Sequence, residues 1–269
     1  MSVEPNKGKE LVADSDNWER HWQRFADSAA LNPAQAMRHQ LVLDLWGERA
    51  ADTSANFVDF GSGQGDFLDK FQRRYGNAKL LGLELSTRGV AISRKKVPSA
   101  TFLAADLFSP SKEMDSYRGW AGGAVCSEVL EHVDDPTAFL RVASQYLSAN
   151  AMILVTVPGG RMSAFDRYIG HRRHFTRESL REILVRGGYR VEKIYRAGFP
   201  FFNLYRLAVI ARGDKLVRDA EARPDREIGG LAGIAARIFG WLFKMNLRDS
   251  PFGLQIVAVA FTPQTRPEA

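Results

Sequence analysis

Short apolar runs alternate with stretches of helical spacing along most of the chain. The runs have the length and composition of buried strands, and they lie at 56–60, 79–85, 100–106, 122–128, 151–158 and 253–262. A further strand is expected at 190–197, where RVEKIYRA mixes apolar and charged residues. Apolar positions three and four residues apart predict helices between them, at 66–75, 86–96, 136–147 and 176–187. Repeated strand–helix units indicate an α/β fold with a doubly wound parallel sheet, covered by helices on both faces. Ligands of such sheets bind beyond the carboxyl ends of the strands.

The chain before the first strand and before the last one has a different pattern. Residues 1–14 predict a disordered leader. Residues 15–50 predict two N-terminal helices that cover the active site, with a break at Asn32-Pro33. We expect 51–198 and 251–269 to form one domain, and 199–250 to form a helical insertion that caps the substrate.

The helix expected over 176–187 carries signals at both of its ends. Thr176 can cap its start, and Gly187-Gly188 can close it. We expect the capping box to be incomplete, because Ser179 rather than a glutamate stands at the third helical position.

Composition narrows the class of protein. The 269 residues are 45% apolar and 25% charged, which is typical of a soluble protein with a substantial core. Cys126 is the single cysteine, so an intrachain disulfide is excluded. The N-terminus lacks the apolar segment of a secretory signal, and no stretch reaches the roughly 20 apolar residues of a membrane span. A cytoplasmic protein is the prediction.

Charge is unevenly distributed along the chain. The formal net charge is +6, and most of the arginine excess follows residue 150. This favours an anionic partner for the second half, which could be an acidic substrate, a membrane surface or nucleic acid. A solvated basic surface explains so small an excess equally well.

A glycine-rich turn follows the first strand, in the segment VDFGSGQGDF at 58–67. Glycines at alternate positions let the backbone approach a ligand closely, and the helix that follows presents free N–H groups. Glu84 ends the second strand about 20 residues later, where a carboxylate can bind both hydroxyls of a ribose. A dinucleotide is disfavoured, because Asp66 stands where that fingerprint requires its third glycine.

Three further segments complete the pattern: LGLELS at 81–86, AADLF at 104–108 and SEVLEHVDDP at 127–136. With DFGSGQG at 59–65, they resemble the class I S-adenosylmethionine-dependent methyltransferases in order and spacing. The likeness is greatest to the small-molecule branch that includes ubiquinone-biosynthesis enzymes. It implies a Rossmann-like seven-stranded sheet in which the last strand, 253–262, is antiparallel to the other six.

The resemblance also implies a site for S-adenosylmethionine. Asp59 and the glycines would surround the methionine part, Glu84 would hold the ribose, and Asp106 would meet the adenine amino group. The full set of implied cofactor-binding residues is Asp59, Gly61, Ser62, Gly63, Gly65, Glu84, Leu85, Asp106, Leu107, Glu128 and Val129.

The segment GHRRHFT, beginning at Gly170, follows the fifth strand and is expected to border the substrate cavity. A hydroxyl acceptor needs a base with a pKa near the working pH, which favours histidine. His171 and His174 are the candidate bases, with His132 after the fourth strand as a third. Other expected substrate-binding residues are Arg172, Arg173 and Phe175. A metal site is not expected, because no carboxylate or thiolate has the spacing to complete one.

The insertion ends in a basic amphipathic stretch at 231–248. On a helix, Arg237, Lys244 and Arg248 share one narrow face, and the apolar face contains Ile234, Ile238, Leu242 and Met245. This helix could be ordinary core, a lid over a large apolar substrate, or a contact with an anionic membrane, at about 1 kcal/mol per basic residue.

The leading hypothesis is transfer of a methyl group from S-adenosylmethionine to an oxygen of a small or lipid-like metabolite, as in secondary metabolism. An RNA or protein methyltransferase is the first alternative. Nucleic acid is the less favoured partner, because SEVL at 127–130 stands where an [ND]PP[YF]-like turn is common in nucleic-acid enzymes. A non-methylating protein that binds the same cofactor is the second alternative, and the oligomeric state is left open.

Overall fold

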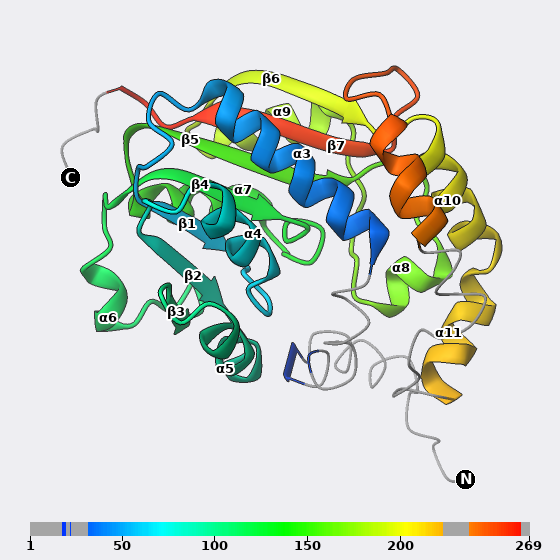
Figure 1. Cartoon of the computed structure of the whole chain (residues 1–269), viewed down its shortest axis with the longest axis horizontal. Helices are drawn as coiled ribbons and strands as arrows, with labels where there is room; N and C mark the ends of the chain where they lie inside the picture. Colours follow the sequence, from blue (N-terminus) through cyan, green and yellow to red (C-terminus); the bar gives the residue numbers. More distant parts are fainter. Residues whose placement is uncertain (1–17, 20–21, 23–31, 223–236, 265–269) are drawn as a thin grey trace, which may run out of the picture.

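The computed structural model describes residues 18–19, 22, 32–222 and 237–264 of the chain. Its centre is a seven-stranded sheet with the order β3-β2-β1-β4-β5-β7-β6 (Figure 1). The strands are β1 Phe57–Phe60, β2 Leu80–Glu84, β3 Thr101–Ala104, β4 Ala121–Ser127, β5 Leu147–Pro158, β6 Arg190–Ala197 and β7 Gln255–Phe261. The leader at 1–14 and nearly all of the first N-terminal helix expected from the sequence lie outside the described residues.

The strand directions confirm the predicted sheet. β1 pairs in parallel with β2 and β4, and β4 pairs in parallel with β5. β7 is antiparallel to both β5 and β6, which confirms the predicted antiparallel strand. The order reverses at β1 and β4, so a crevice opens beyond their carboxyl ends.

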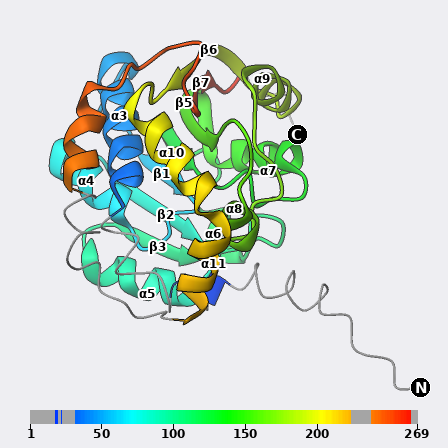
Figure 2. The same ribbon diagram turned by 90° about the vertical axis from the view of Figure 1, so that its right-hand side faces the viewer.

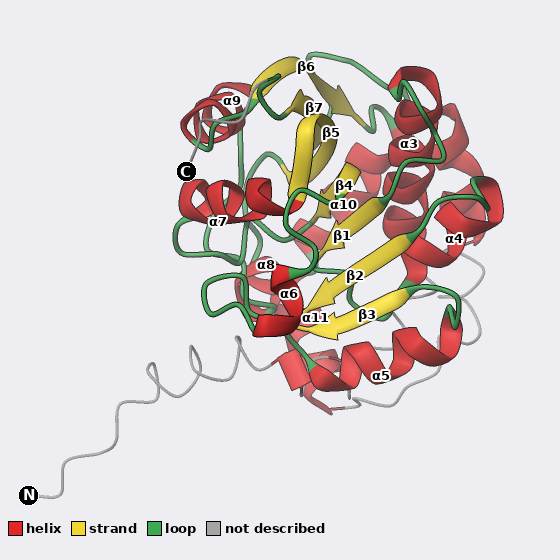
Figure 3. Ribbon diagram, turned by 90° about the vertical axis from the view of Figure 1, so that its left-hand side faces the viewer, coloured by secondary structure: helices red, strands yellow, loops and turns green. Residues whose placement is uncertain are grey.

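Helices cover both faces of the sheet (Figure 3). One face packs against α3 Pro33–Arg49, α4 Asp66–Arg74 and α5 Thr87–Lys96, and the other against α7 Pro136–Ala143 and α9 Arg177–Arg186. Short helices lie in the connections, at α6 Lys112–Asp115 and α8 Ala164–Tyr168. None of the helices among the described residues is long and apolar enough to cross a bilayer.

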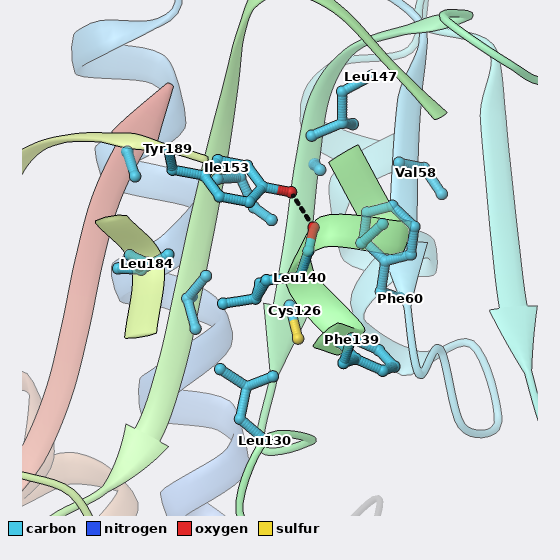
Figure 4. Packing of buried hydrophobic residues seen from close by; sticks show 14 of the residues in the cluster. Val58, Phe60, Cys126, Leu130, Phe139, Leu140, Leu147, Ile153, Leu184 and Tyr189 are labelled. Atoms are coloured by element: carbon cyan, nitrogen blue, oxygen red, sulfur yellow. Dashed lines mark hydrogen bonds between the residues drawn. The ribbon is translucent and has the colours of Figure 1, made fainter. Parts of the chain in front are cut away.

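The period-two alternation of strand side chains divides the core into two layers. Phe57 of β1 packs with the α3–α4 layer, whereas Val58 and Phe60 point into the α7–α9 layer. In the latter layer the Tyr189 hydroxyl donates to the Leu140 carbonyl oxygen at 3.0 Å, which ties the chain after α9 to α7 (Figure 4).

Local signals explain most helix boundaries, with one correction. Asn32 caps α3 and Pro33 occupies its first turn. The capping box of α9 is complete, contrary to expectation: the Ser179 hydroxyl accepts from the Thr176 backbone N–H at 2.9 Å, and Thr176 accepts from the Ser179 N–H. The Ser179 hydroxyl therefore accepts the hydrogen bond from the N-cap backbone N–H that a glutamate accepts in the usual capping box.

The chain between β6 and β7 forms a helical layer at one end of the sheet. It contains α10 Phe201–Ala211 and α11 Gly213–Ala222, then helical residues 237–242 and a 3-10 turn at Phe243–Met245. α10 and the 237–245 segment lie side by side in both views (Figures 1 and 2). Phe202, Phe243 and Ala34 form the centre of a small third core where this layer meets α3.

Candidate active site

One cavity of about 1160 Å³ extends from the glycine turn to α10. Its floor is formed by the residues at the carboxyl ends of β1, β2 and β4, and α10 and Phe239 form the wall opposite. The two ends of this cavity have different chemistry.

The glycine turn leaves β1 in a conformation that only glycine adopts easily. Gly61, Gly63 and Gly65 have φ values of 82°, 56° and 79°. A Cβ added to Gly61 would overlap the Cγ2 atom of Val129. The turn is held by Gly61 N–H and Ser62 N–H, which both donate to the Leu83 carbonyl oxygen, at 2.8 and 3.0 Å. The bare backbone is therefore fixed against the neighbouring strand end.

Glu84 lies directly beside this turn. Its carboxylate accepts from the Gly63 N–H at 2.9 Å and the Ser86 N–H at 3.0 Å, and from the indole N–H of Trp22 at 3.4 Å. Burial raises the pKa of Glu84, and these hydrogen bonds oppose that rise. The contact with Trp22 carries no local sequence signal, because it depends on how the N-terminal segment packs over the sheet.

The innermost part of this end is suited to a cation. Asp59 is 3% exposed, and burial together with the nearby Glu84 raises its pKa to about 8. Ser62 Oγ is buried and has no hydrogen-bond partner among the described residues. An ammonium or sulfonium group would compensate the acidic pair, and a polar ligand would satisfy the hydroxyl.

The outer part of this end is suited to a flat apolar ring. Leu85 and Phe108 line the cavity and are 54% and 52% exposed, whereas Leu107 is buried. Asp106 accepts from the Phe108 N–H at 2.9 Å, which fixes the loop after β3. Phe108 is the last residue of the AADLF motif and lines the cavity, although no role was expected for it from the sequence.

The middle of the cavity lies at the end of β4. Glu128 has a φ of 57°, and its carboxylate accepts from Thr156 Oγ1 at 3.1 Å and from Gln255 Nε2 at 2.9 Å. The guanidinium of Arg38 on α3 lies 3.8 Å from the same carboxylate. Val129 packs against Gly61. Arg38 and Gln255 are further lining residues that no local motif identifies.

A chain of two histidines borders the cavity at this level. His174 Nδ1 is 3.1 Å from the Gly160 carbonyl oxygen, and His174 Nε2 is 3.2 Å from His171 Nδ1. A carbonyl oxygen only accepts, so His174 carries its hydrogen on Nδ1 and its Nε2 accepts from His171 Nδ1. The free lone pair of neutral His171 is therefore on Nε2. Burial and the neighbouring His132 lower the pKa of His171 to about 3, so the ring is neutral at neutral pH.

The GHRRHFT segment is only partly exposed to the cavity. His171 and Arg172 line it, together with His132 from the chain after β4, and Arg172 is paired with Asp134. His174 lies behind His171 with its side chain 4% exposed, so it can act only through its neighbour.

Two residues of this segment were misplaced by the sequence argument. Arg173 donates to the Asp134 carbonyl oxygen at 2.8 Å and is not among the lining residues. Phe175 is 3% exposed and belongs to the core. Its backbone N–H donates to the Pro158 carbonyl oxygen, and Phe175 forms an isolated bridge with Gly159 just beyond the end of β5, which fixes the direction of the ring.

Carboxylates do lie beside these histidines, so the expectation that no carboxylate could complete a metal site with them is wrong. Within each of two sets, Glu131–His132–His171 and Asp166–His171–His174, the donor atoms lie within 4.8 Å of one another. Such sets can hold a divalent metal ion. The chain fold, rather than local spacing, brings Asp166 of α8 to this place; that the protein works without a metal stays a prediction.

The two carboxylates differ in their surroundings. Asp166 accepts from both terminal nitrogens of Arg206 on α10, at 3.0 and 2.9 Å. Burial alone would raise the pKa of Asp166, but Arg206 and Ser163 hold it below its ordinary value. Glu131 is fully buried, and neither carboxylate oxygen has a hydrogen-bond partner among the described residues. Burial, with Glu128 nearby, raises the pKa of Glu131 well above its ordinary value.

The seven-stranded sheet, the glycine turn after β1 and the carboxylates of Asp59 and Glu84 beside it are together typical of a class I methyltransferase. A family model described as a methyltransferase domain matches residues 30–194, and the chain belongs to that family. Its cofactor is S-adenosylmethionine, and the cavity end built by Asp59, Ser62 and Glu84 fits that molecule's cationic and polar groups.

One curated protein is similar to this chain in sequence, and several solved structures are similar to it in fold. The ubiquinone biosynthesis O-methyltransferase of Sodalis glossinidius is 24% identical over 145 residues, which span 54% of this chain and 55% of the relative. The crystal structure of the cyclase SpnF is similar with a TM-score of 0.59 at 17% identity, over 86% of this chain and 82% of that one. Haemonchus contortus phosphoethanolamine N-methyltransferase 2, in complex with S-adenosylmethionine, has a TM-score of 0.54 at 16% identity, over 84% of this chain and 52% of that one.

Proposed function

We propose that the protein transfers the methyl group of S-adenosylmethionine to an oxygen of a small or lipid-like acceptor, with His171 as the base. The cofactor supplies a methyl group already activated by the sulfonium. The protein has to align the acceptor, take up its proton and keep water away. The observation that carries the proposal is His171 on the wall of the same cavity, neutral and with an Nε2 that the bond to His174 leaves unused. Its pKa of about 3 lies below the near-neutral value that suits a base best, so the proton would move to it as the methyl group is transferred, when the acceptor oxygen becomes strongly acidic.

At the cofactor end, each residue has a role that suits its surroundings. Asp59 would balance the ammonium group, and Glu84 would accept from the ribose hydroxyls in place of the Trp22 indole. Leu85, Leu107 and Phe108 would enclose the adenine. Gly61, Ser62, Gly63 and Gly65 would follow the methionine part, and Asp106, Glu128 and Val129 would complete the wall.

At the acceptor end, the two histidines divide the work. His171 Nε2 would take the acceptor's hydroxyl proton. His174 would hold the hydrogen on His171 Nδ1 through the bond that it completes to the Gly160 carbonyl oxygen. His174 is then a positioning residue, and His132, in edge contact with His171 at 4.8 Å between ring centroids, borders the same space.

The size and lining of the cavity support a sizeable acceptor. A volume of about 1160 Å³ exceeds the roughly 300–1,000 Å³ of ordinary single-ligand pockets, so a second molecule fits beside the cofactor. The wall formed by Phe202, Tyr205, Val209 and Phe239 is apolar and aromatic, as a lipid-like acceptor requires. The curated relative's name, an O-methyltransferase, supports oxygen as the methylated atom.

The test uses S-adenosylmethionine labelled in its methyl group, with a cell extract separated into small-molecule, protein and RNA fractions. We expect label in the small-molecule fraction. We expect His171→Ala to lower kcat about 100-fold or more while S-adenosylhomocysteine affinity changes little. Asn77→Ala, in the α4–β2 connection, is the control.

Three outcomes would contradict the proposal. Label in RNA or protein would establish the alternative class of substrate. Tight cofactor binding without transfer to any fraction would point to a non-methylating role, such as that of the similar cyclase. An unchanged kcat in His171→Ala would leave this histidine a structural residue.

A further inference from the structure

Exposed apolar side chains are concentrated on the helical layer between β6 and β7. Ten large hydrophobic residues of the described chain are about half exposed or more. Seven of these ten lie between 204 and 252, and two of the others, Leu85 and Phe108, line the cofactor end of the cavity. Six of these seven form what we call the lid surface: Leu204, Leu207, Ile238, Trp241, Met245 and Phe252.

α10 has two apolar faces. Phe202, Tyr205 and Val209 face the cavity. Leu204 and Leu207 lie on the opposite side and are 55% and 57% exposed. Residues three or four apart lie on the same face of a helix, so Phe202, Tyr205 and Val209 share one face and Leu204 and Leu207 share the other. An α-helix that belongs to the core would need only the first of these faces to be apolar.

The 237–245 segment repeats this arrangement. Phe239 and Phe243 pack inward against Tyr205, with ring centroids 5.6 and 5.8 Å apart, whereas Ile238, Trp241 and Met245 are exposed. Phe252 continues the lid surface beside α10, because its carbonyl oxygen accepts from Asn203 at 2.7 Å. In Figure 2, α10 runs down the side that faces the viewer, and the 237–245 segment lies to its left.

Basic residues stand among these apolar ones. Arg237 and Lys244 are exposed on the same segment as Trp241, and the sequence from 237 to 248 contains no aspartate or glutamate. Arg212 and Lys215 are exposed where α10 gives way to α11. Exposed tryptophan and aliphatic side chains with flanking lysine and arginine are typical of helices that lie in the interface of an anionic bilayer.

We propose that the lid surface docks on an anionic phospholipid bilayer. Charge favours this occupant over a second copy of the chain, because a two-fold interface brings the same patch of both copies together, so the patch that carries Arg237 and Lys244 would face one of the same charge. The position of the cavity gives the contact a purpose. α10 carries part of both surfaces, since Leu204 and Leu207 are exposed and Phe202, Tyr205 and Val209 line the cavity, so an amphiphile leaving the bilayer would have a short path to it.

The experiment is co-sedimentation of the full chain with phosphatidylcholine vesicles, with and without phosphatidylglycerol. We expect binding to the anionic vesicles, weakened by salt. Arg237→Glu with Lys244→Glu should weaken it at least about fivefold, and Trp241→Ser should also weaken it. Matched controls are Val185→Ser, an equally exposed apolar residue on α9, and Lys112→Glu on α6, which should bind as the wild type does.

Two further measurements keep the outcome decisive. S-adenosylhomocysteine binding checks that each variant keeps its cavity, and this readout does not depend on vesicles. Light scattering measures the mass of the free protein. Failure of the wild type to bind anionic vesicles, or equal binding by the lid-surface variants, would overturn the proposal. So would a dimer that Trp241→Ser dissociates, since the surface would then be an interface between copies.

Discussion

Single residues at strand ends account for the cofactor end of the site. Gly61, Glu84 and Asp106, which all line the cavity, could be found from the sequence, because each lies at a fixed offset from an apolar strand. Trp22 and Arg38 could not be found, because their contacts with Glu84 and Glu128 join segments far apart in the chain. Phe175 was misassigned for the same reason: pairing with the end of β5 decides its direction.

Gly61 offers a test of the close backbone approach. Gly61→Ala should weaken S-adenosylhomocysteine binding at least about tenfold, because its Cβ would overlap Val129 and shift the turn. Gly188→Ala is the matched control, since Gly188 also has a positive φ, of 91°, but nothing lies within 4 Å of an added Cβ. Both variants should lose stability through backbone strain, and only the first should lose affinity in calorimetry. Equal affinities would show that the turn does not contact the ligand.

Asp59 predicts a pH effect on cofactor binding. Its pKa of about 8 leaves it mostly protonated at pH 7, and a bound ammonium group favours the ionised form. Binding of S-adenosylhomocysteine at pH 7 should therefore release about one proton, and affinity should rise as pH increases from 7 toward 8. Calorimetry in buffers of different ionisation enthalpy measures this release. Asp59→Asn should abolish it, and an unchanged proton count in that variant would refute the assignment.

At the scale of elements, periodicity was sufficient for the sheet and insufficient for the short helices. All seven strands were predicted near their observed positions, and most of them are predominantly apolar runs, whereas β6 (RVEKIYRA) mixes apolar and charged residues. α8 was missed, although Ser163 and Asp166 have capping-box spacing and form the box in the structure. This helix matters because Asp166 connects it to α10 and to the histidines, a contact that needs the tertiary fold.

The Arg206–Asp166 pair should hold α10 in place. Asp166 and Arg206 are 2% and 13% exposed, and Asp166→Asn would leave the guanidinium without its charged partner. We expect a loss of about 3 kcal/mol in the free energy of unfolding by urea. Asp115→Asn, in the exposed pair with Arg118, should cost less than about 1 kcal/mol. Similar costs for the two variants would mean that the buried pair does not anchor α10.

At the scale of the molecule, the important feature is that both ends of the site open into one cavity. The sequence predicted a cofactor site and a cap, but it could not show that α3, α8 and α10 converge on the end of β4. That convergence depends on packing between segments far apart in the sequence, since residues of α3, α8 and α10 line the same cavity. It places the cofactor end, the histidines and the apolar lid wall around a single space.

The most direct test of the central claim is calorimetric titration of the wild-type protein and of Glu84→Ala with S-adenosylhomocysteine. We predict that the wild type binds one molecule, and that the variant binds about 10- to 100-fold more weakly, since charge-assisted hydrogen bonds to the ribose are lost. Glu113→Ala, an exposed carboxylate on α6, should bind as the wild type does. A wild type that fails to bind, or a Glu84→Ala variant with full affinity, would contradict the account.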